Sequence, residues 1–247
     1  MSIADKLTTI AENEPKVFNA GKEAENKAFW DAYLQEGKRQ DCTCLFAGKA
    51  WNRDTFNPPS GTVIKPTIPT QMFARFAFTG VDLVELLEEK NITLDFSECT
   101  SFVEVFYYTG ATHFGVIDTR SAKNLNNAFA YVGNYLKTID LLILKEDGSQ
   151  TFNTYSFAGN SGVENITIQG VIGQPNIDAK GWTKLNKASI TSFINALSST
   201  TTGLSITLSK TAVNNAFETS SGKADGSTST EWNALISTKS NWTISLV

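Results

Sequence analysis

The sequence predicts a mixed α+β fold in which an N-terminal helical segment is followed by a stack of repeated units. One sequence pattern recurs: an aliphatic residue and Asp are followed further along the chain by Phe, as in Leu94-Asp95 to Phe106 and Ile117-Asp118 to Phe129. A period of roughly 20 to 50 residues is the signature of a solenoid, whereas the first ~40 residues show the apolar spacing of helices. The phenylalanines expected to anchor the repeats lie 23 to 36 residues apart and are Phe76, Phe106, Phe129, Phe157, Phe193 and Phe217.

Residues 1–40 are expected to form an attachment and oligomerisation segment made of two helices. Pro15 lacks an amide hydrogen, so it divides the region into helices at about 3–13 and 16–36. Helices this short are marginal alone, so their apolar stripe must pack on the chain's own domain, on a sister chain or on a partner. The residues expected to mediate oligomerisation lie at heptad-like positions and are Ile3, Leu7, Ile10 and Val17.

Residues 41–71 are expected to form a linker, or junction, that contains one short strand. The stretch from Cys42 to Phe46 has the composition of a strand, and the prolines at positions 58, 59, 66 and 69 favour extended backbone. Trp51 and Phe56 fit anchors that pack this loop down.

Residues 72–247 are expected to form the solenoid, with atypical capping ends. Val81 to Glu89 predicts an amphipathic helix in the first repeat, and residues 231–236 and 241–247 predict a closing helix and strand. Each unit should have a short strand, a turn and a short helix that carries the anchor Phe, as in Ala122 to Ala130. The expected strands are residues 93–96, 115–118, 138–144, 166–168 and 204–208.

Composition and charge exclude several classes of function. The chain has 247 residues, of which 41% are hydrophobic and 19% charged, and a net charge of -4, which fits an ordered protein. The absence of a basic cluster argues against a nucleic-acid partner, and no apolar run approaches the ~20 residues needed to cross a membrane. The N-terminus lacks the pattern of a signal peptide, and three cysteines do not indicate a disulfide framework. We therefore expect synthesis in the cytoplasm, no nucleic-acid partner and no membrane insertion.

No catalytic constellation is visible in the sequence. The single histidine, His113, has no Ser or Cys motif near it and fits a surface or turn residue better than a catalyst or metal ligand. Asp95, Asp118 and Asp178 recur at one repeat position. Paired carboxylates can hydrolyse glycosides, but a regular row better fits a hydrogen bond that each turn needs. We expect no enzyme activity, no cofactor and no metal site.

Parts of the sequence resemble known families. The phrases from Leu94 to Phe106 and from Asn124 to Phe129 resemble the degenerate leucine-rich repeats of bacterial surface proteins. The two ends resemble a family of tail-associated proteins encoded by phages and prophages of Gram-positive bacteria, through residues 1–14, Ala28-Phe29-Trp30-Asp31, Phe46-Ala47-Gly48-x-x-Trp51 and residues 239–244. The resemblance implies an N-terminal helical, oligomerising segment, a leucine-rich-repeat-like solenoid of short strands and short helices, and no catalytic residues.

The resemblance implies a structural or adhesive protein of a phage tail tip or baseplate, such as a tail fibre that binds a host receptor. Its expected partners are other tail or baseplate proteins, a glycan or protein on the host cell surface, and copies of itself, as a homotrimer in the virion. The alternatives are a bacterial leucine-rich-repeat interaction module outside any virion and a polysaccharide-degrading tail enzyme. The candidate surface-contact residues are aromatic side chains in the repeat turns: Tyr107, Tyr108, Tyr131, Tyr135, Tyr155 and Trp182.

Overall fold

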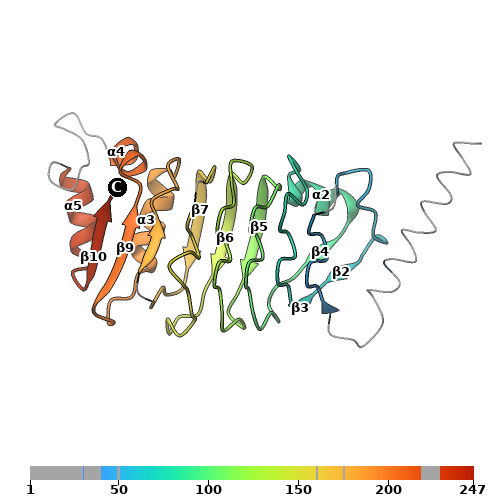
Figure 1. Ribbon diagram of the computed structural model, residues 1–247, viewed down its shortest axis with the longest axis horizontal. Coiled ribbons are helices and arrows are strands. Elements are labelled where there is room, and N and C mark those ends of the chain that lie inside the picture. The colour runs from blue at the N-terminus through green and yellow to red at the C-terminus, as the bar shows by residue number, and fades with distance from the viewer. Residues whose placement is uncertain (1–29, 31–39, 49–50, 160, 175, 218–228) are drawn as a thin grey trace, which may run out of the picture.

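The computed structural model describes residues 30, 40–48, 51–159, 161–174, 176–217 and 229–247. Within these residues the fold mixes helices and strands, which confirms the predicted α+β class. Short strands lie side by side along the long axis of the molecule (Figure 1). The expected oligomerisation residues Ile3, Leu7, Ile10 and Val17 lie outside the described residues.

All pairings between the described strands are parallel. At the N-terminal end of the stack, β1 (Gln40–Asp41) pairs with β3 (Pro66–Ile68), and β2 (Val63–Ile64) pairs with β4 (Thr93–Leu94). The central sheet has the order β5 (His113–Asp118), β6 (Thr138–Ile143) and β7 (Asn165–Gln169). The last sheet has the order β10 (Trp242–Leu246), β9 (Leu204–Leu208) and β8 (Ile177–Ala179).

In the central sheet, paired residues of neighbouring strands lie about one unit apart in the sequence, as His113 and Thr138 do. Single parallel bridges extend this pairing beyond the strands, for example from Ser101 to Asn124 and from Asn124 to Thr151. Parallel strands cannot be joined by a tight hairpin, so each needs a crossover connection. Here turns and short helices provide those connections.

The described helices begin at residues that can cap them. Asp82, Asn186 and Ser229 precede α2 (Leu83–Lys90), α3 (Lys187–Ala196) and α5 (Thr230–Ser237), and the side chain of each accepts a backbone N–H of the first turn. Helix α2 ends at Asn91, whose φ of 54° is left-handed. The remaining helix, α4 (Lys210–Phe217), carries the predicted anchor Phe217.

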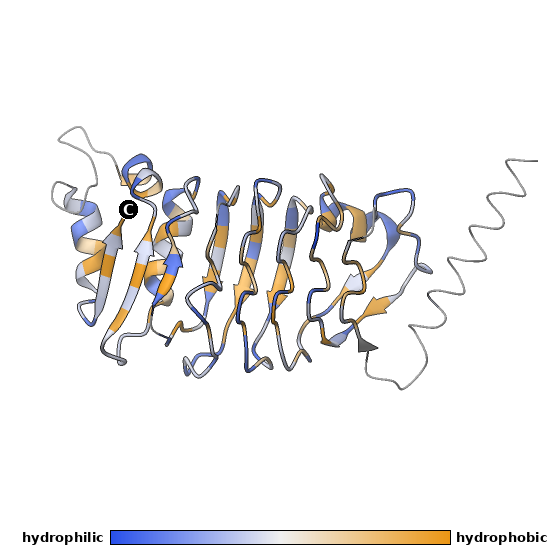
Figure 2. Cartoon of the chain, viewed as in Figure 1, coloured by the Kyte–Doolittle hydropathy of each residue, from blue (hydrophilic) through white to orange (hydrophobic). Residues whose placement is uncertain are grey.

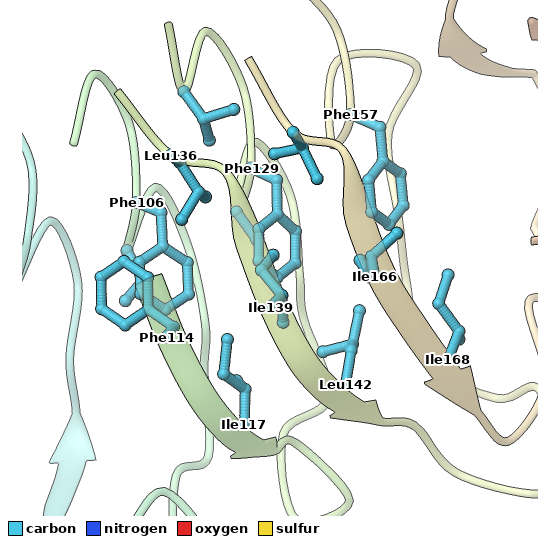
Figure 3. Close-up of a cluster of buried hydrophobic side chains, with 14 of the residues drawn as sticks. Phe106, Phe114, Ile117, Phe129, Leu136, Ile139, Leu142, Phe157, Ile166 and Ile168 are labelled. Carbon is cyan, nitrogen blue, oxygen red and sulfur yellow. The ribbon is translucent and has the colours of Figure 1, made fainter. Parts of the chain in front are cut away.

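A row of buried phenylalanine rings runs through the core. The rings of Phe106 and Phe129 stack with centroids 5.2 Å apart, and those of Phe129 and Phe157 stack at 5.5 Å. Figure 3 shows these three rings in a row beside strand residues such as Ile139 and Leu142. Hydrophobic residues alternate with more polar ones along β7 and β9 (Figure 2). In β5 and β6 the buried residues lie three positions apart, as Phe114 and Ile117 do. The predicted anchors Phe106, Phe129, Phe157, Phe193 and Phe217 are all buried.

Three predictions about local structure are wrong. Phe76 is 55% exposed, and Phe73 stacks on Phe106 in its place at 5.8 Å. Residues 122–130 form turns instead of a helix, because asparagines there bond locally: the Asn126 N–H donates to Oδ1 of Asn124. Residues 42–46 form turns and bends instead of a strand.

The expected linker contributes to the same core as the strands that follow it. The ring of Phe46 packs against those of Phe73 and Phe78, with centroids 5.3 and 5.2 Å away. Trp30 and Phe56 also pack on Phe46. These contacts form an aromatic cluster at the N-terminal end of the stack.

A buried glutamine joins neighbouring turns. Gln150 is fully buried, and its amide nitrogen donates to the carbonyl oxygens of Thr119 and Ala122 at 2.7 and 3.0 Å. Its Oε1 accepts the N–H of Lys145 at 2.7 Å. The side chain thus provides partners for main-chain groups that the turns leave without a strand neighbour.

Replacing Gln150 with leucine should lower the free energy of unfolding by about 1–3 kcal/mol, because leucine keeps the volume but leaves buried main-chain groups unpaired. Chemical denaturation monitored by circular dichroism measures the change. Ser149→Ala, at the exposed neighbouring position, is the matched control and should stay within about 0.5 kcal/mol of wild type. Equal stability of Gln150→Leu and wild type would contradict the assigned role.

Candidate functional site

Exposed aromatic side chains gather where successive turns present equivalent positions to solvent. Phe76, Tyr108 and Tyr131 have left-handed φ angles of 62°, 53° and 51°. Gly159 occupies the corresponding place in the next turn, with a φ of 91°. Main-chain hydrogen bonds align these turns, from Phe76 N to Tyr108 O at 2.7 Å and from Tyr131 N to Ala158 O at 2.8 Å.

The left-handed backbone at these positions costs free energy, about 1–2 kcal/mol for a residue other than glycine. Phe76, Tyr108 and Tyr131 are nevertheless large side chains, and they are 55%, 39% and 39% exposed. The same conformation occurs at the fully buried Phe78, so it is the exposure of these rings that makes this surface the leading candidate for a binding site.

The rings contact one another across three turns. Tyr108 and Tyr131 stack with centroids 5.6 Å apart, and Tyr107 packs edge-on against both, at 4.7 and 5.8 Å. Phe76 lies 6.1 Å from Tyr108 and 6.4 Å from Tyr135. These five side chains form what we call the aromatic row: Phe76, Tyr107, Tyr108, Tyr131 and Tyr135.

Tyr108 and Gly159 both lie close to the Tyr131 ring. Tyr108 stacks on one side, and Gly159 lies so close that a Cβ atom added to it would be 2.5 Å from Cδ1 of Tyr131. Since stacked rings leave their edges free, this part of the row offers ring edges and hydroxyl groups to a partner. Such a surface combines apolar contact with hydrogen bonding.

Replacing Gly159 with alanine should displace the Tyr131 ring and destabilise the protein more than a comparable glycine substitution. Gly80→Ala is the matched control, because Gly80 also has a positive φ, of 73°, but has open space around its Cβ position. Both variants should incur the strain of about 1–2 kcal/mol, and Gly159→Ala should incur a further loss from the steric clash. Thermal denaturation of both variants measures the difference, and identical melting temperatures would contradict it.

A row of polar side chains runs beside the aromatic row. Glu104 accepts hydrogen bonds from the amides of Gln71 and Asn127, at 2.5 and 3.3 Å. Asn127 in turn accepts from the amide of Asn153 at 3.0 Å. These bonds cross four successive turns, so they hold the turns that carry the rings in a fixed register.

Partial burial raises the pKa of the Tyr107 hydroxyl, and the neighbouring Tyr108, Tyr131 and Glu104 raise it further. The phenol therefore stays protonated at neutral pH and can donate a hydrogen bond.

The candidate surface-contact residues predicted from the sequence fall into three groups. Tyr107, Tyr108, Tyr131 and Tyr135 come together in the aromatic row. Tyr155 is 57% exposed but stands outside it. The expectation for Trp182 is corrected: its side chain is fully buried, with its ring 5.7 Å from Phe157 and 5.9 Å from Phe193.

Sequence reasoning missed Phe76 as a member of the row, because it treated that residue as a buried anchor. The signal that could have found it is the place of Phe76 in the repeat, next to Arg75 and three residues beyond the apolar Phe73.

The recurrent aspartates bond within their own turns, as predicted. Asp95, Asp118 and Asp178 each accept the backbone N–H of the residue two positions later, at 2.9 to 3.1 Å. A hydrogen bond from the Arg120 guanidinium also lowers the pKa of Asp118.

Two hollows lie elsewhere on the described surface. One, of about 160 Å³, lies between α2 and β5 and is lined by residues such as Leu83, Leu87, Phe114 and Val116. The other, of about 630 Å³, is an open hollow beside β7 and α3, near Lys187 and Asn195. In the described part of the chain, no group of three or more His, Cys, Asp or Glu side chains has the arrangement of a metal site. No helix there has the length and hydropathy of a membrane span.

No known protein family, curated protein or solved structure matches the chain. The aromatic row is suited to binding, since it holds exposed rings and hydroxyl groups in a fixed arrangement.

Proposed function

We propose that this chain is a structural and adhesive protein of a phage tail tip or baseplate that contacts the host cell surface. The observation that carries the proposal is the aromatic row, because exposed and rigidly held tyrosines are side chains through which proteins bind other surfaces. The place on a phage tail is supported by the resemblance of the opening and closing segments of the sequence to tail-associated proteins.

The scaffold, in this proposal, is a leucine-rich-repeat-like solenoid. Parallel pairing between residues one unit apart, as between Phe114 and Ile139, supports it. The stacked phenylalanines provide further support, because equivalent residues of successive units meet in the core. In such a scaffold each unit contacts mainly its neighbours, so repetition can extend one binding face over several turns.

Binding by the aromatic row should cost little side-chain conformational entropy. A tyrosine side chain has two rotatable χ angles, so it loses little conformational freedom when a partner covers it. Contacts between Tyr107, Tyr108 and Tyr131 restrict the rings before binding. Several copies on one particle would then multiply modest single-site affinity into strong attachment.

In the same proposal, residues 1–40 attach the protein to other tail or baseplate proteins and join it into a homotrimer. The heptad-like spacing of Ile3, Leu7, Ile10 and Val17 supports this role. The protein would be made in the bacterial cytoplasm and reside in the virion.

Adsorption competition tests the adhesive role. Purified full-length protein is incubated with host cells before addition of phage particles whose genome encodes it. The expected result is slower adsorption that depends on protein concentration. Unchanged adsorption at a saturating concentration, under conditions where an antiserum to whole particles does block it, would overturn the proposal.

A bacterial leucine-rich-repeat interaction module outside any virion is the second candidate. The stacking of Tyr131 on Tyr108 favours it, since ring edges and hydroxyl groups suit contact with a protein surface. Light scattering and a pull-down with baseplate proteins discriminate between the two. An oligomer that retains a baseplate protein supports the tail role, and a monomer without such a partner supports the module.

A further inference from the structure

The single histidine of the chain lies between two carboxylates from neighbouring turns. His113 is the first residue of β5, not part of a turn as its sequence context suggested. Its Nδ1 is 3.0 Å from Oδ2 of Asp82, and its Nε2 is 2.9 Å from Oδ1 of Asp140. The side chains of His113 and Asp82 are partly buried, at 24% and 29% exposure, and that of Asp140 is exposed, at 49%.

This arrangement joins three elements through one ring. Asp82 is the N-cap of α2, where its other carboxylate oxygen accepts the N–H of Glu85 at 3.1 Å. Asp140 lies in β6, which pairs with β5. The Asp82 and His113 backbones also form a parallel bridge. The ring therefore connects the start of α2 to both β5 and β6.

Both contacts can be hydrogen bonds only when the imidazole carries two protons. A neutral imidazole has one N–H, so its second nitrogen would face a carboxylate oxygen with two lone pairs opposed. The imidazolium form donates from both nitrogens and also offsets the charge of the carboxylates. Partial burial lowers the pKa of His113, but the hydrogen bonds to Asp140 and Asp82 outweigh it, so the pKa is raised overall.

We propose that Asp82, His113 and Asp140 form a proton-dependent clamp that holds α2 and β6 against β5. Asp82 on α2 and Asp140 on β6 are the charged groups that reach the ring in the described structure. Glu85, in the first turn of α2, lies 3.6 Å from Arg53.

The clamp requires the protonated imidazole, so a rise in pH weakens it. The clamp is fully formed below the pKa of an unfolded histidine, about 6.5, and is lost as pH rises through the higher pKa of the folded state. Loss of one bond weakens the attachment of either the start of α2 or β6 to the His113 ring. Because α2 and β5 line the 160 Å³ hollow, weakening of the clamp loosens the wall of that hollow.

Nuclear magnetic resonance titration of the full-length, tag-free protein tests the clamp directly, because one histidine gives one imidazole signal. The expected pKa lies above that of a peptide containing residues 110–116. Asp82→Asn and Asp140→Asn should each lower it, and asparagine at position 82 retains the N-cap. Asp147→Asn is the control, since the Asp147 carboxylate accepts the N–H of Ser149 and asparagine can do the same.

Hydrogen exchange at the α2 amides, corrected for the intrinsic effect of pH, provides the structural readout. In the wild-type protein, protection of the α2 amides should fall as pH rises through the pKa of His113. The expected fall is about tenfold for each pKa unit by which His113 in the folded protein exceeds His113 in the peptide. His113→Gln should show no such fall. The proposal is overturned by a His113 pKa at or below the peptide value, by the same pKa in Asp82→Asn, Asp140→Asn and wild type, or by α2 protection that does not change with pH.

Asp82, His113 and Asp140 lie five or six residues after Phe76, Tyr108 and Tyr135 in the sequence. Weaker adhesion at higher pH is therefore a consequence that rests on the proposed function. The titration and exchange measurements need no ligand, so failure of the adhesive role leaves the test of the clamp intact.

Discussion

Replacing Phe106 with alanine should lower the free energy of unfolding by about 3–5 kcal/mol, the usual loss for a buried phenylalanine. Its ring is fully buried and stacks between Phe73 and Phe129, with centroids 5.8 and 5.2 Å away. Phe114 packs against it at 4.4 Å. Removing the ring leaves a cavity that joins three successive turns, so the melting transition should also lose cooperativity. Guanidinium denaturation followed by circular dichroism and tryptophan fluorescence measures both effects.

Phe76→Ala is the matched control for Phe106→Ala, because the same ring is removed from the surface. Its effect on the free energy of unfolding should lie within about 0.5 kcal/mol. If Phe106→Ala melts like wild type, the stacked phenylalanines do not hold the turns together. A large loss from Phe76→Ala would instead show that the aromatic row is a structural element.

Replacing Tyr131 with alanine should weaken binding to host cells by at least about 30-fold, which corresponds to about 2 kcal/mol. Tyr131 lies within the aromatic row, where it contacts Tyr107 and Tyr108. Its loss removes one contact surface and releases the neighbouring rings, so a partner must then restrict them on binding. Sedimentation of labelled protein with cells gives the binding curve.

Tyr155→Ala separates the aromatic row from exposed tyrosines in general. Tyr155 is 57% exposed and has no ring contact among the described residues. Its loss should leave binding within about twofold of wild type if the row is the binding surface. Equal losses from Tyr131→Ala and Tyr155→Ala, or no loss from either, would contradict the assignment. Tyr131→Phe then measures the part that the hydroxyl group plays.

Most of the strands could be predicted because their signals are local. Aliphatic residues alternate in β7, where Ile166 and Ile168 face the core, and the spacing of Phe106, Phe129 and Phe157 reflects one buried position in each turn. The spacing of phenylalanines alone could not decide among Phe73, Phe76 and Phe78, although the charged Arg75 beside Phe76 is a local signal of exposure. The choice depends on a left-handed backbone at Phe76 and Phe78, and such a conformation leaves no periodic signal at a residue other than glycine.

The candidate site was predictable in its chemistry but not in its geometry. Tyrosines in the repeat turns indicated a contact surface, yet the sequence did not distinguish the exposed Tyr131 from the buried Trp182. The difference arises from packing against Phe157 and Phe193, residues from other parts of the chain.

The partners of His113 carried a signal that reading motifs along the chain missed. Asp82 and Asp140 lie 31 and 27 residues away, which is about one repeat on either side. Superposing the repeats, instead of searching for short motifs, would place the three side chains in one row.

The closing segment also has a structural role, since the indole nitrogen of Trp242 donates to the carbonyl oxygen of Ser198 at 2.8 Å.

Electron microscopy of phage particles labelled with gold-conjugated antibody to this chain tests the central claim most directly. The particles are those released by the strain whose genome encodes the chain, and particles from a deletion strain are the control. An adhesive tail protein predicts label at the distal end of the tail on wild-type particles and none on the control. Wild-type particles without label, with the protein recovered only from the cell lysate, would contradict the account.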